Sequence, residues 1–310
     1  YGMPGAIRVV TGEVNPSGHT TATFAANSLS APSAENFGLH AYNYGSKTPR
    51  AAGDSFVSYN EGIYVGYRYY ETRYEDVVMG TQNVGEYDYA STVAYPFGCG
   101  MSYTTFDWSN FQSSYDAATD SFNISVDVKN TGSVAGKEVV QAYFQSPYTE
   151  YDKANGIEKA AAELCGFAKT DVLAPGASED VTITVPKSEL RTYDANNAKT
   201  YIVDAGDYYF TAATDSHNAV NNILAAKGYT VENTNGRMTA DGNVALTYKW
   251  TNAALDSTTF ATSETGTAIT NLFDEADPNK SSSEPGEVTW LSRSNWVACL
   301  LYTSDAADEL

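Results

Sequence analysis

Alternation of apolar and polar side chains is the clearest pattern in the chain, and it starts after residue 102. Apolar residues at 122, 124, 126 and 128 are each followed by a polar one. This spacing predicts a strand with one buried and one solvated face. Residues 138–144 fit another strand, and residues 181–185 repeat the alternation. In the first of these two runs we expect one face to carry Val140, Ala142 and Phe144 and the other to carry Val139, Gln141 and Tyr143.

Turn signals divide this region into a series of short strands. Asn130-Thr131-Gly132 and Ala174-Pro175-Gly176 predict turns, and Pro186 ends a strand. One helical turn is expected at 187–193, and further strands are expected at 164–167, 200–203 and 208–214, the last of them closing the domain. Six or seven strands over about 115 residues predict a mainly β fold, an antiparallel β-sandwich of immunoglobulin-like type. The lack of a Cys…Trp…Cys arrangement favours the fibronectin type III-like variant.

The residues on either side of the predicted sandwich have a different character. The first 50 residues are loop-like, and only residues 7–10 resemble a short buried strand or the end of a helix. After Lys227 the chain is rich in Asn, Thr, Ser and Gly, which predicts two or three β segments with loose loops. Residues 274–287 are polar and turn-rich, as linkers are.

Acidic side chains outnumber basic ones by 38 to 18 among 310 residues, which gives a formal net charge of -20. A negative field of this size repels phosphate backbones and anionic lipids, so nucleic acid and membrane surfaces are excluded as partners. No apolar run approaches the roughly 18 residues of a membrane span, and no signal-peptide pattern is present. We therefore expect a soluble protein, with a cytoplasmic and a secreted location both open.

Residues 59–71 and 95–106 are the segments that most resemble a functional site. The first alternates tyrosines with other residues and predicts a strand in which Glu61, Arg68 and Glu71 form local ion pairs. The second predicts a glycine-bent entry into the sandwich. The 24 tyrosines of the chain fit a β-rich protein, in which both segments serve packing. The functional alternative is that exposed tyrosines stack on sugars.

Two glycine-containing segments are similar to phosphate-binding loops but do not have the required spacing. Residues 132–137 have three residues between the glycines, and Glu138 follows the lysine, so a hairpin is predicted instead of a P-loop. Gly98-Cys99-Gly100 is followed by Tyr103 where a dinucleotide-binding turn needs its third glycine. No GxSxG sequence marks a hydrolase serine. We therefore expect no cofactor.

Metal-ligand spacing is also missing. The histidines are isolated in the sequence, and each is predicted to be a surface or loop residue: His19, His40 and His217. The calcium-loop spacing of Asp277, Asn279 and Ser281 lacks the turn glycine and the final glutamate, so a solvated linker is predicted. The cysteines form neither a CxxC pair nor a disulfide framework: Cys99, Cys165 and Cys299. No metal site is expected, and the redox compartment stays open.

A series of short motifs follows a fixed order along residues 12–176. They are GEVNPSG at 12–18, EGIYVGYRYY at 61–70, YPFG at 95–98, SYTTF at 102–106, VKNTG at 128–132, AGKEVVQ at 135–141, LCGFAK at 164–169 and LAPG at 173–176. Together they resemble glycoside hydrolase family 3. The first motif is similar to the exit loop of that family's α/β sandwich domain, and the others are similar to the entry and body of its fibronectin type III-like domain. Cys99 and Met101 depart from the usual tyrosine and leucine.

The resemblance implies retaining hydrolysis of β-linked glycosides by two carboxylates. In the family, an aspartate nucleophile lies in a barrel domain and a glutamate acid/base in the α/β sandwich domain. Neither motif is present here, so the resemblance assigns no catalytic residue, and the residues that bind substrate stay unassigned. ITNLFD at 269–274 and WLSRSNW at 290–296 resemble the linker of permuted members, in which the barrel follows. We therefore expect an inactive segment of a bacterial β-glucosidase-like enzyme, with a glycoside substrate and the missing domains as partners.

These observations divide the chain into six parts. We expect the remnant of an α/β sandwich domain at 1–50, a connecting segment at 51–101, a fibronectin type III-like domain at 102–215, a β-rich extension at 216–273 and a linker toward a barrel at 274–298. Residues 299–310, CLLYTSDAADEL, resemble translated sequencing-adapter sequence and are expected to be non-native. The alternative function is a non-enzymatic fibronectin-type adhesion or carbohydrate-binding module.

Overall fold

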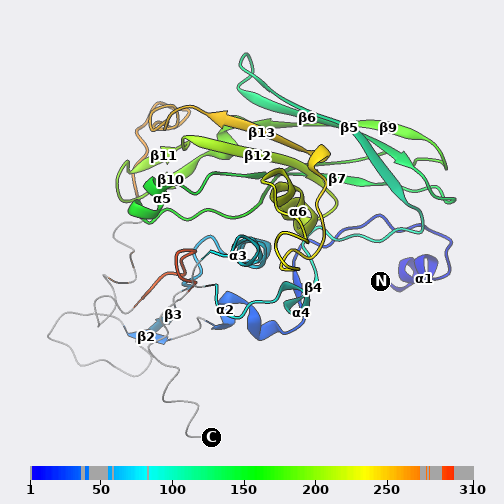
Figure 1. The fold of residues 1–310 in the computed structure, drawn as a ribbon, viewed down its shortest axis with the longest axis horizontal. Helices are drawn as coiled ribbons and strands as arrows, with labels where there is room; N and C mark the ends of the chain where they lie inside the picture. Colours follow the sequence, from blue (N-terminus) through cyan, green and yellow to red (C-terminus); the bar gives the residue numbers. More distant parts are fainter. Residues whose placement is uncertain are drawn as a thin grey trace, which may run out of the picture.

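Two antiparallel sheets packed face to face form the centre of the structure, a computed structural model that describes residues 2–35, 39–41, 55–57, 59–81, 84–272, 277, 279 and 288–296 (Figure 1). The three-stranded sheet has the order β5-β6-β9, with β5 at Phe106–Asp116, β6 at Ser121–Asn130 and β9 at Ser178–Pro186. The four-stranded sheet has the order β13-β12-β7-β8, with β13 at Thr247–Asn252, β12 at Gly206–Ala213, β7 at Val139–Gln145 and β8 at Glu163–Lys169. The predicted fold class is confirmed.

The alternating apolar residues fill the space between the two sheets. All four of those on β6 are at most 1% exposed. The two expected faces of β7 are also confirmed, because Val140, Ala142 and Phe144 belong to the sandwich core and Tyr143 belongs to a second core on the other side. Gln141 and Gln145 share the side of Tyr143, since side chains alternate along a strand. Because Gln145 lies on the face of β7 that meets the helices, its side chain reaches the candidate site described below.

The far edge of the sandwich differs from the prediction. The helical turn (η2, Lys187–Leu190) and the strand β11 (Thr200–Ile202) are confirmed, and β11 pairs with β10 (Thr192–Asp194) in a separate ribbon. However, β12 is not the closing strand, because β13 pairs along its outer edge. The aromatic residues Tyr248 and Trp250 of β13 pack against the sandwich core, which explains why this late strand joins the sheet.

A layer of helices covers the outer face of the four-stranded sheet (Figure 1). It contains α3 (Tyr67–Met79) and α6 (Ser216–Ala226), which contact each other. Buried residues from both helices and from β7 form the second core: Tyr69, Tyr70, Tyr74, Val78, Tyr143, Ala219, Val220 and Leu224. The structure thus has three layers, two sheets and one layer of helices. None of the helices in the described part of the chain has the length and apolar composition of a membrane-spanning segment.

Residues 67–71 are helical, so the strand predicted over 59–71 is wrong. Gly66, with φ 59°, precedes α3, and Gly80, with φ 69°, ends it. Both backbone conformations are left-handed and favour glycine. The apolar side chains of the helix also recur at helical spacing, at Tyr67, Tyr70, Tyr74 and Val78. Because Tyr67 and Tyr69 are two residues apart, as on one face of a strand, this helical spacing is hard to recognise in the sequence.

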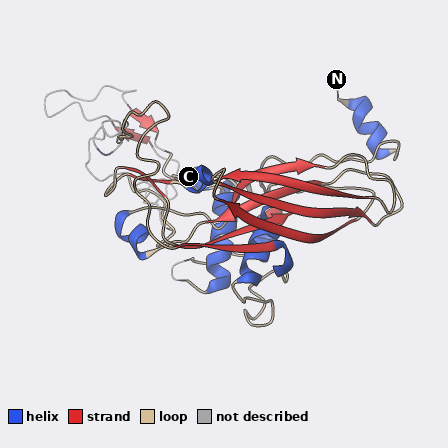
Figure 2. Cartoon of the chain, turned by 90° about the horizontal axis from the view of Figure 1, so that it is seen from above, coloured by secondary structure: helices blue, strands red, loops and turns tan. Residues whose placement is uncertain are grey.

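The remaining elements before the sandwich are short. They are α1 (Met3–Val10), β1 (Phe24–Ala25), η1 (Ser28–Ser30), α2 (Pro32–Glu35), β2 (Leu39–Ala41), β3 (Ser55–Val57), α4 (Tyr89–Thr92) and β4 (Val93–Tyr95). Strand β1 pairs with β4, and β2 pairs with β3. Residues 7–10 form the end of the helix α1, which confirms one of the two predicted alternatives. They are not buried, because α1 lies apart from the sandwich (Figure 2) and Val10 is 81% exposed.

The residues after the sandwich are less β-rich than predicted. The described part of this region, residues 216–272, begins with α6, continues through η3 (Val244–Leu246) and contributes a single named strand, β13. In the predicted linker, Val288, Leu291 and Arg293 are buried, so residues 288–296 pack against the protein instead of crossing solvent. The remaining α-helix, α5 (Glu150–Asn155), follows β7. The predicted non-native tail lies outside the described residues.

Replacing Phe210 by alanine should destabilise the protein by about 3–5 kcal/mol, because removal of a fully buried aromatic side chain leaves a cavity in the core. Phe210 is 0% exposed, and its ring centroid lies 4.3 Å from that of Phe122 in the facing sheet. The matched control is Phe167→Ala, since Phe167 is 70% exposed and should change the free energy of unfolding by no more than about 0.5 kcal/mol. Urea titration of both variants measures the difference. Equal losses would contradict the sandwich core described here.

Candidate functional site

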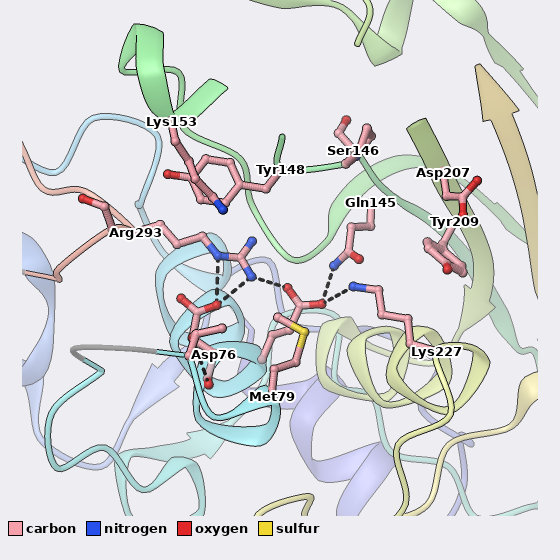
Figure 3. Close-up of a pocket in the computed structure, with 14 residues that line it drawn as sticks. Asp76, Met79, Gln145, Ser146, Tyr148, Lys153, Asp207, Tyr209, Lys227 and Arg293 are labelled. Carbon is pink, nitrogen blue, oxygen red and sulfur yellow. Dashed lines mark hydrogen bonds and ion pairs between the residues drawn. The ribbon is translucent and has the colours of Figure 1, made fainter. Parts of the chain in front are cut away.

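A pocket of about 460 Å³ opens between the layer of helices and the end of the four-stranded sheet (Figure 3). Five stretches of the chain line it, and they are far apart in the sequence. The lining residues are Glu75, Asp76, Met79 and Thr81 from α3 and its end, Gln145 from β7, Ser146, Pro147 and Tyr148 from the loop that follows it, Lys153 from α5, Asp207 and Tyr209 from β12, Lys227 at the end of α6, and Arg293 and Ser294 from the last described segment.

Arg293 lies at the base of this pocket, with its side chain 7% exposed. Its Nη2 donates to Glu75 Oε2 at 2.6 Å and to Asp76 Oδ1 at 2.7 Å, and its Nε donates to Asp76 Oδ1 at 2.9 Å. A guanidinium out of water needs carboxylate partners of this kind, because the desolvation of an unpaired charge costs several kcal/mol. The two carboxylates raise the pKa of Arg293, so it stays charged.

Glu75 is balanced from its other side by two further donors. Lys227 Nζ donates to Glu75 Oε1 at 2.7 Å, and Gln145 Nε2 donates to the same oxygen at 2.8 Å. Although burial opposes ionisation, the combined effect of Lys227, Arg293 and Gln145 lowers the pKa of Glu75 to about 2. For the neighbouring Asp76, burial outweighs its contacts with Arg293 and raises the pKa. Glu75 is therefore a fixed anion, and a fixed anion is not a general acid at neutral pH.

The segment that carries Arg293 is held by contacts on both sides of the arginine. Leu291 N donates to Asn60 O at 2.7 Å, and Arg293 N donates to Glu158 Oε2 at 2.9 Å. Three residues later, Trp296 Nε1 donates to Asp76 Oδ2 at 2.9 Å. The Trp296 ring also lies 4.9 Å from that of Tyr64, centroid to centroid. Residues 288–296 are thus fastened to the start of the helical layer, to α3 and to the loop before β8.

The rim of the pocket carries neutral polar groups and apolar side chains. Ser146, Tyr148 and Tyr209 have hydroxyl groups for which no hydrogen bond is found within the described residues. Arg293 and Lys153 lie 5.4 and 5.5 Å from the centre of the Tyr148 ring. Figure 3 shows Tyr148 and Tyr209 on either side of Gln145. The pocket therefore offers hydroxyl groups around a base of paired charges.

A second buried polar cluster surrounds Glu71, one turn before Glu75 on α3. Tyr89 Oη donates to Glu71 Oε1 at 2.6 Å, Ser216 Oγ donates to the same oxygen at 3.1 Å, and His217 Nδ1 lies 2.9 Å from Oε2. The His217 ring stacks on Tyr89 at 3.8 Å between centroids. The prediction of a surface or loop histidine is wrong for His217, because it lies in the first turn of α6 and packs against α3.

The predicted local ion pairs of the 59–71 segment are also wrong. Arg68 binds Glu163 on β8 at 2.9 Å, and Glu71 binds the residues of α4 and α6 just described. Glu61 is 6% exposed and its Oε2 has no hydrogen-bond partner. Arg68 and Glu71 have partners in distant segments because both lie on the helix α3, which directs Arg68 toward the sheet and Glu71 toward the neighbouring helices. Lys159 forms a third buried cluster, in which it binds Asp204 and lies 3.7 Å from Asp152 Oδ1.

The glycine motif at 132–137 is not the predicted hairpin, because it leads from β6 in the three-stranded sheet to β7 in the four-stranded sheet. Gly132 N donates to Asn130 Oδ1, and Asn130 Nδ2 donates to Val134 O and Leu173 O. A Cβ atom at Gly132 would overlap Thr104 Oγ1, so the glycine is required for packing.

The histidines, cysteines and acidic residues considered as metal ligands form no metal-binding group within the described residues. His19 Nε2 lies 3.9 Å from Glu138 Oε1, and burial lowers the pKa of His19 and raises that of Glu138. The side chain of His40 is outside the described residues. No group of three potential metal ligands occurs in the described part of the chain. Asn279 N donates to Asp277 Oδ1, and Ser281 and Cys299 are outside the described residues. Cys99 and Cys165 are free thiols.

The pocket residues were mostly missed by sequence reasoning. The predicted strand ended one residue before Gln145, although continuing its second face, with Gln141 and Tyr143, would have included this residue. Glu75 and Asp76 follow the segment that was misassigned as a strand, and Arg293 was taken as part of a linker. If residues 67–78 are recognised as a helix from their spacing, Glu75 and Asp76 lie on a largely buried helix. Buried carboxylates are rarely unpaired, so a nearby cation is then expected.

The fold and the pocket define a fibronectin type III-like sandwich with an attached layer of helices. The family model of the fibronectin type III-like domain matches residues 138–216. The β-glucosidase of Ruminococcus albus is 36% identical over 222 residues, which cover 70% of this chain and 19% of the relative.

Solved structures agree with the sequence comparison. β-Glucosidase 3B from Thermotoga neapolitana in complex with α-D-glucose matches with a TM-score of 0.54 and 28% identity, over 81% of this chain and 26% of that one. The GH3 β-glucosidase of Bifidobacterium adolescentis matches with a TM-score of 0.52 and 28% identity, over 69% and 26%. Over these residues the chain is similar in sequence and structure to β-glucosidases, one of which is a GH3 enzyme. It spans about a fifth of the length of the curated relatives that it matches.

Replacing Glu75 by glutamine should flatten the dependence of stability on pH in acid. The pKa of Glu75 is lowered from 4.5 to about 2 in the folded state. Its contribution to stability is therefore present above pH 4.5 and is lost as the pH falls toward 2, by about 3 kcal/mol in total. The raised pKa of Asp76 acts in the opposite direction, but Asp76 is present in both proteins.

Urea titration between pH 2 and pH 7 measures this effect for the wild type and for Glu75→Gln. The matched control is Glu150→Gln, because the side chain of Glu150 is 89% exposed and pairs with a lysine at the surface. The control should follow the wild-type pH dependence. Identical curves for Glu75→Gln and the wild type would show that the buried ion cluster does not hold Glu75 ionised.

Proposed function

We propose that this chain is part of a retaining glycoside hydrolase that acts on β-linked glucosides. The observation that carries the proposal is the combined match to β-glucosidases, in sequence over 70% of the chain and in structure over 81% of it. Within such an enzyme the sandwich and its layer of helices brace the domains that carry the catalytic groups. The substrate class comes from the names of the relatives, and the particular glycoside stays open.

The catalytic carboxylates are proposed to lie in other domains of the enzyme, in a barrel and an α/β sandwich. A retaining glycosidase needs two carboxyl groups about 5–5.5 Å apart across the sugar, one of them able to give up a proton. The carboxylates of the pocket described above are engaged differently, because Glu75 and Asp76 both bind Arg293. Glu71 is likewise occupied by Tyr89, Ser216 and His217. This engagement supports a structural role for the buried acids.

The division into domains is proposed to follow the same scheme. Residues 1–50 belong to the end of an α/β sandwich domain, 51–101 connect it to the fibronectin type III-like domain, and the chain then leads toward a barrel in a permuted order. The close packing of residues 288–296 on α3 supports a fixed path for the chain after the sandwich. The named strands and helices of residues 67–213 support the placement of the sandwich itself.

The purified chain should show no hydrolysis of 4-nitrophenyl β-D-glucoside above a protein-free blank, because a single missing carboxylate removes most of the rate. The complete reading frame from the same source, expressed in parallel, should hydrolyse this substrate. Turnover by the 310-residue chain that scales with protein concentration would contradict the proposed placement of the carboxylates. An inactive full reading frame that encodes further β-sandwich repeats would instead favour an adhesion module.

A further inference from the structure

The charges around the pocket balance one another. Glu75 and Asp76 are matched by Lys227 and Arg293 at 2.6–2.9 Å. At the rim, Lys153 pairs with Glu150 at 2.6 Å and Asp207 pairs with Lys249 at 3.1 Å. A charged ligand would have to break one of these pairs and leave its partner unmatched, which is costly at the buried base. The charge pattern therefore selects a neutral occupant.

The neutral polar groups of the pocket make a purely apolar ligand equally unsuitable. The hydroxyl groups of Ser146, Tyr148 and Tyr209 have no hydrogen-bond partner within the described residues. Within the described residues Lys227 Nζ donates one hydrogen bond, to Glu75, and it keeps donor capacity because an ammonium group has three protons. An apolar ligand would remove these groups from water without giving them partners, at a cost of about 1–3 kcal/mol each. The occupant must carry several hydroxyl or ether oxygens.

The walls between these polar groups are apolar. Met79 and Pro147 line the pocket, and the rings of Tyr148 and Tyr209 lie on either side of Gln145 (Figure 3). The volume of about 460 Å³ falls within the range of about 300–1,000 Å³ that is usual for small-molecule sites. A neutral molecule with apolar carbon faces and hydroxyl edges satisfies both kinds of wall. A pyranose ring has this character.

We propose that this pocket is a binding site for a neutral glycoside, completed by Ser294 and Arg293 of the segment 288–296. The tyrosine and serine hydroxyls bind ring hydroxyl groups, Lys227 donates a further hydrogen bond, and the apolar side chains contact the carbon face of the sugar. The choice of β-glucosides as probes rests on the proposed function, whereas the neutral, hydroxyl-rich character of the ligand follows from the pocket itself.

Isothermal titration of the 310-residue chain with cellobiose and with methyl β-D-glucoside tests the site directly. A dissociation constant of about 1 mM is expected for the tighter of the two. Glucuronate is the charged comparison, because it keeps the ring and adds one carboxylate. It should bind at least about tenfold more weakly than the neutral glycosides, since it must disturb a charge pair. Tighter binding of glucuronate would overturn the proposal.

Tyr148→Phe and Tyr209→Phe remove one hydroxyl group each and should weaken binding about threefold to tenfold. Ser294→Trp places a large ring at the exposed rim and should abolish binding. The matched control is Tyr95→Phe, since Tyr95 is exposed on the strand β4, outside this pocket. Thermal unfolding of each variant confirms that the fold is retained. Unchanged affinity in all three pocket variants, or no saturable binding of either glycoside up to about 50 mM, would refute the site.

The result separates this inference from the proposed function. If the complete reading frame hydrolyses β-glucosides while the 310-residue chain binds neither glycoside, the pocket proposal fails and the proposed enzyme stands. If the chain binds cellobiose through Tyr148 and Tyr209 but the complete reading frame is inactive, the binding site stands and the enzyme proposal fails.

Discussion

The contact between Arg293 and the two carboxylates of α3 is the interaction on which the layer of helices depends. It joins residues 217 and 218 positions apart in the sequence, at donor–acceptor distances of 2.6–2.9 Å. A buried guanidinium and two buried carboxylates are each unfavourable alone, so the cluster is stable only when all three are present. The last described segment, α3 and the end of α6 must therefore assemble together, and the pocket forms where they meet.

The same constraint explains how a helix as polar as α3 can lie between a sheet and other helices. Glu71 is bound by α4 and α6, and Thr72 Oγ1 accepts from Ala161 N at 2.9 Å. Tyr74 Oη donates to Asn221 Oδ1 at 2.6 Å. These buried polar groups of the helix thus find hydrogen-bond partners in other parts of the chain, as buried polar groups require. Specific polar contacts therefore act together with the apolar second core in positioning this layer.

The sandwich could be predicted from the sequence because its pattern is local. Phe122, Ile124 and Val126 alternate with polar residues, and this alternation identifies a strand and its buried face. The candidate site could not be predicted in this way. Glu75, Lys227 and Arg293 lie on three segments, and nothing within any one segment indicates the partner that makes burial of its charge possible. The position of His217 could not be predicted for the same reason, because no nearby residue in the sequence indicates that its ring stacks on Tyr89.

A double-mutant cycle between Arg293 and Asp76 tests the central claim most directly. Arg293→Met alone should destabilise the protein by about 3–5 kcal/mol, because it leaves the buried Asp76 without its cation and leaves Glu75 with Lys227 alone. If the cluster acts as a unit, the loss in Arg293→Met/Asp76→Asn should be smaller than the sum of the two single losses by about 2 kcal/mol or more. Losses that add to within about 0.5 kcal/mol would mean that the pair is not coupled and that the layer of helices is held by other contacts.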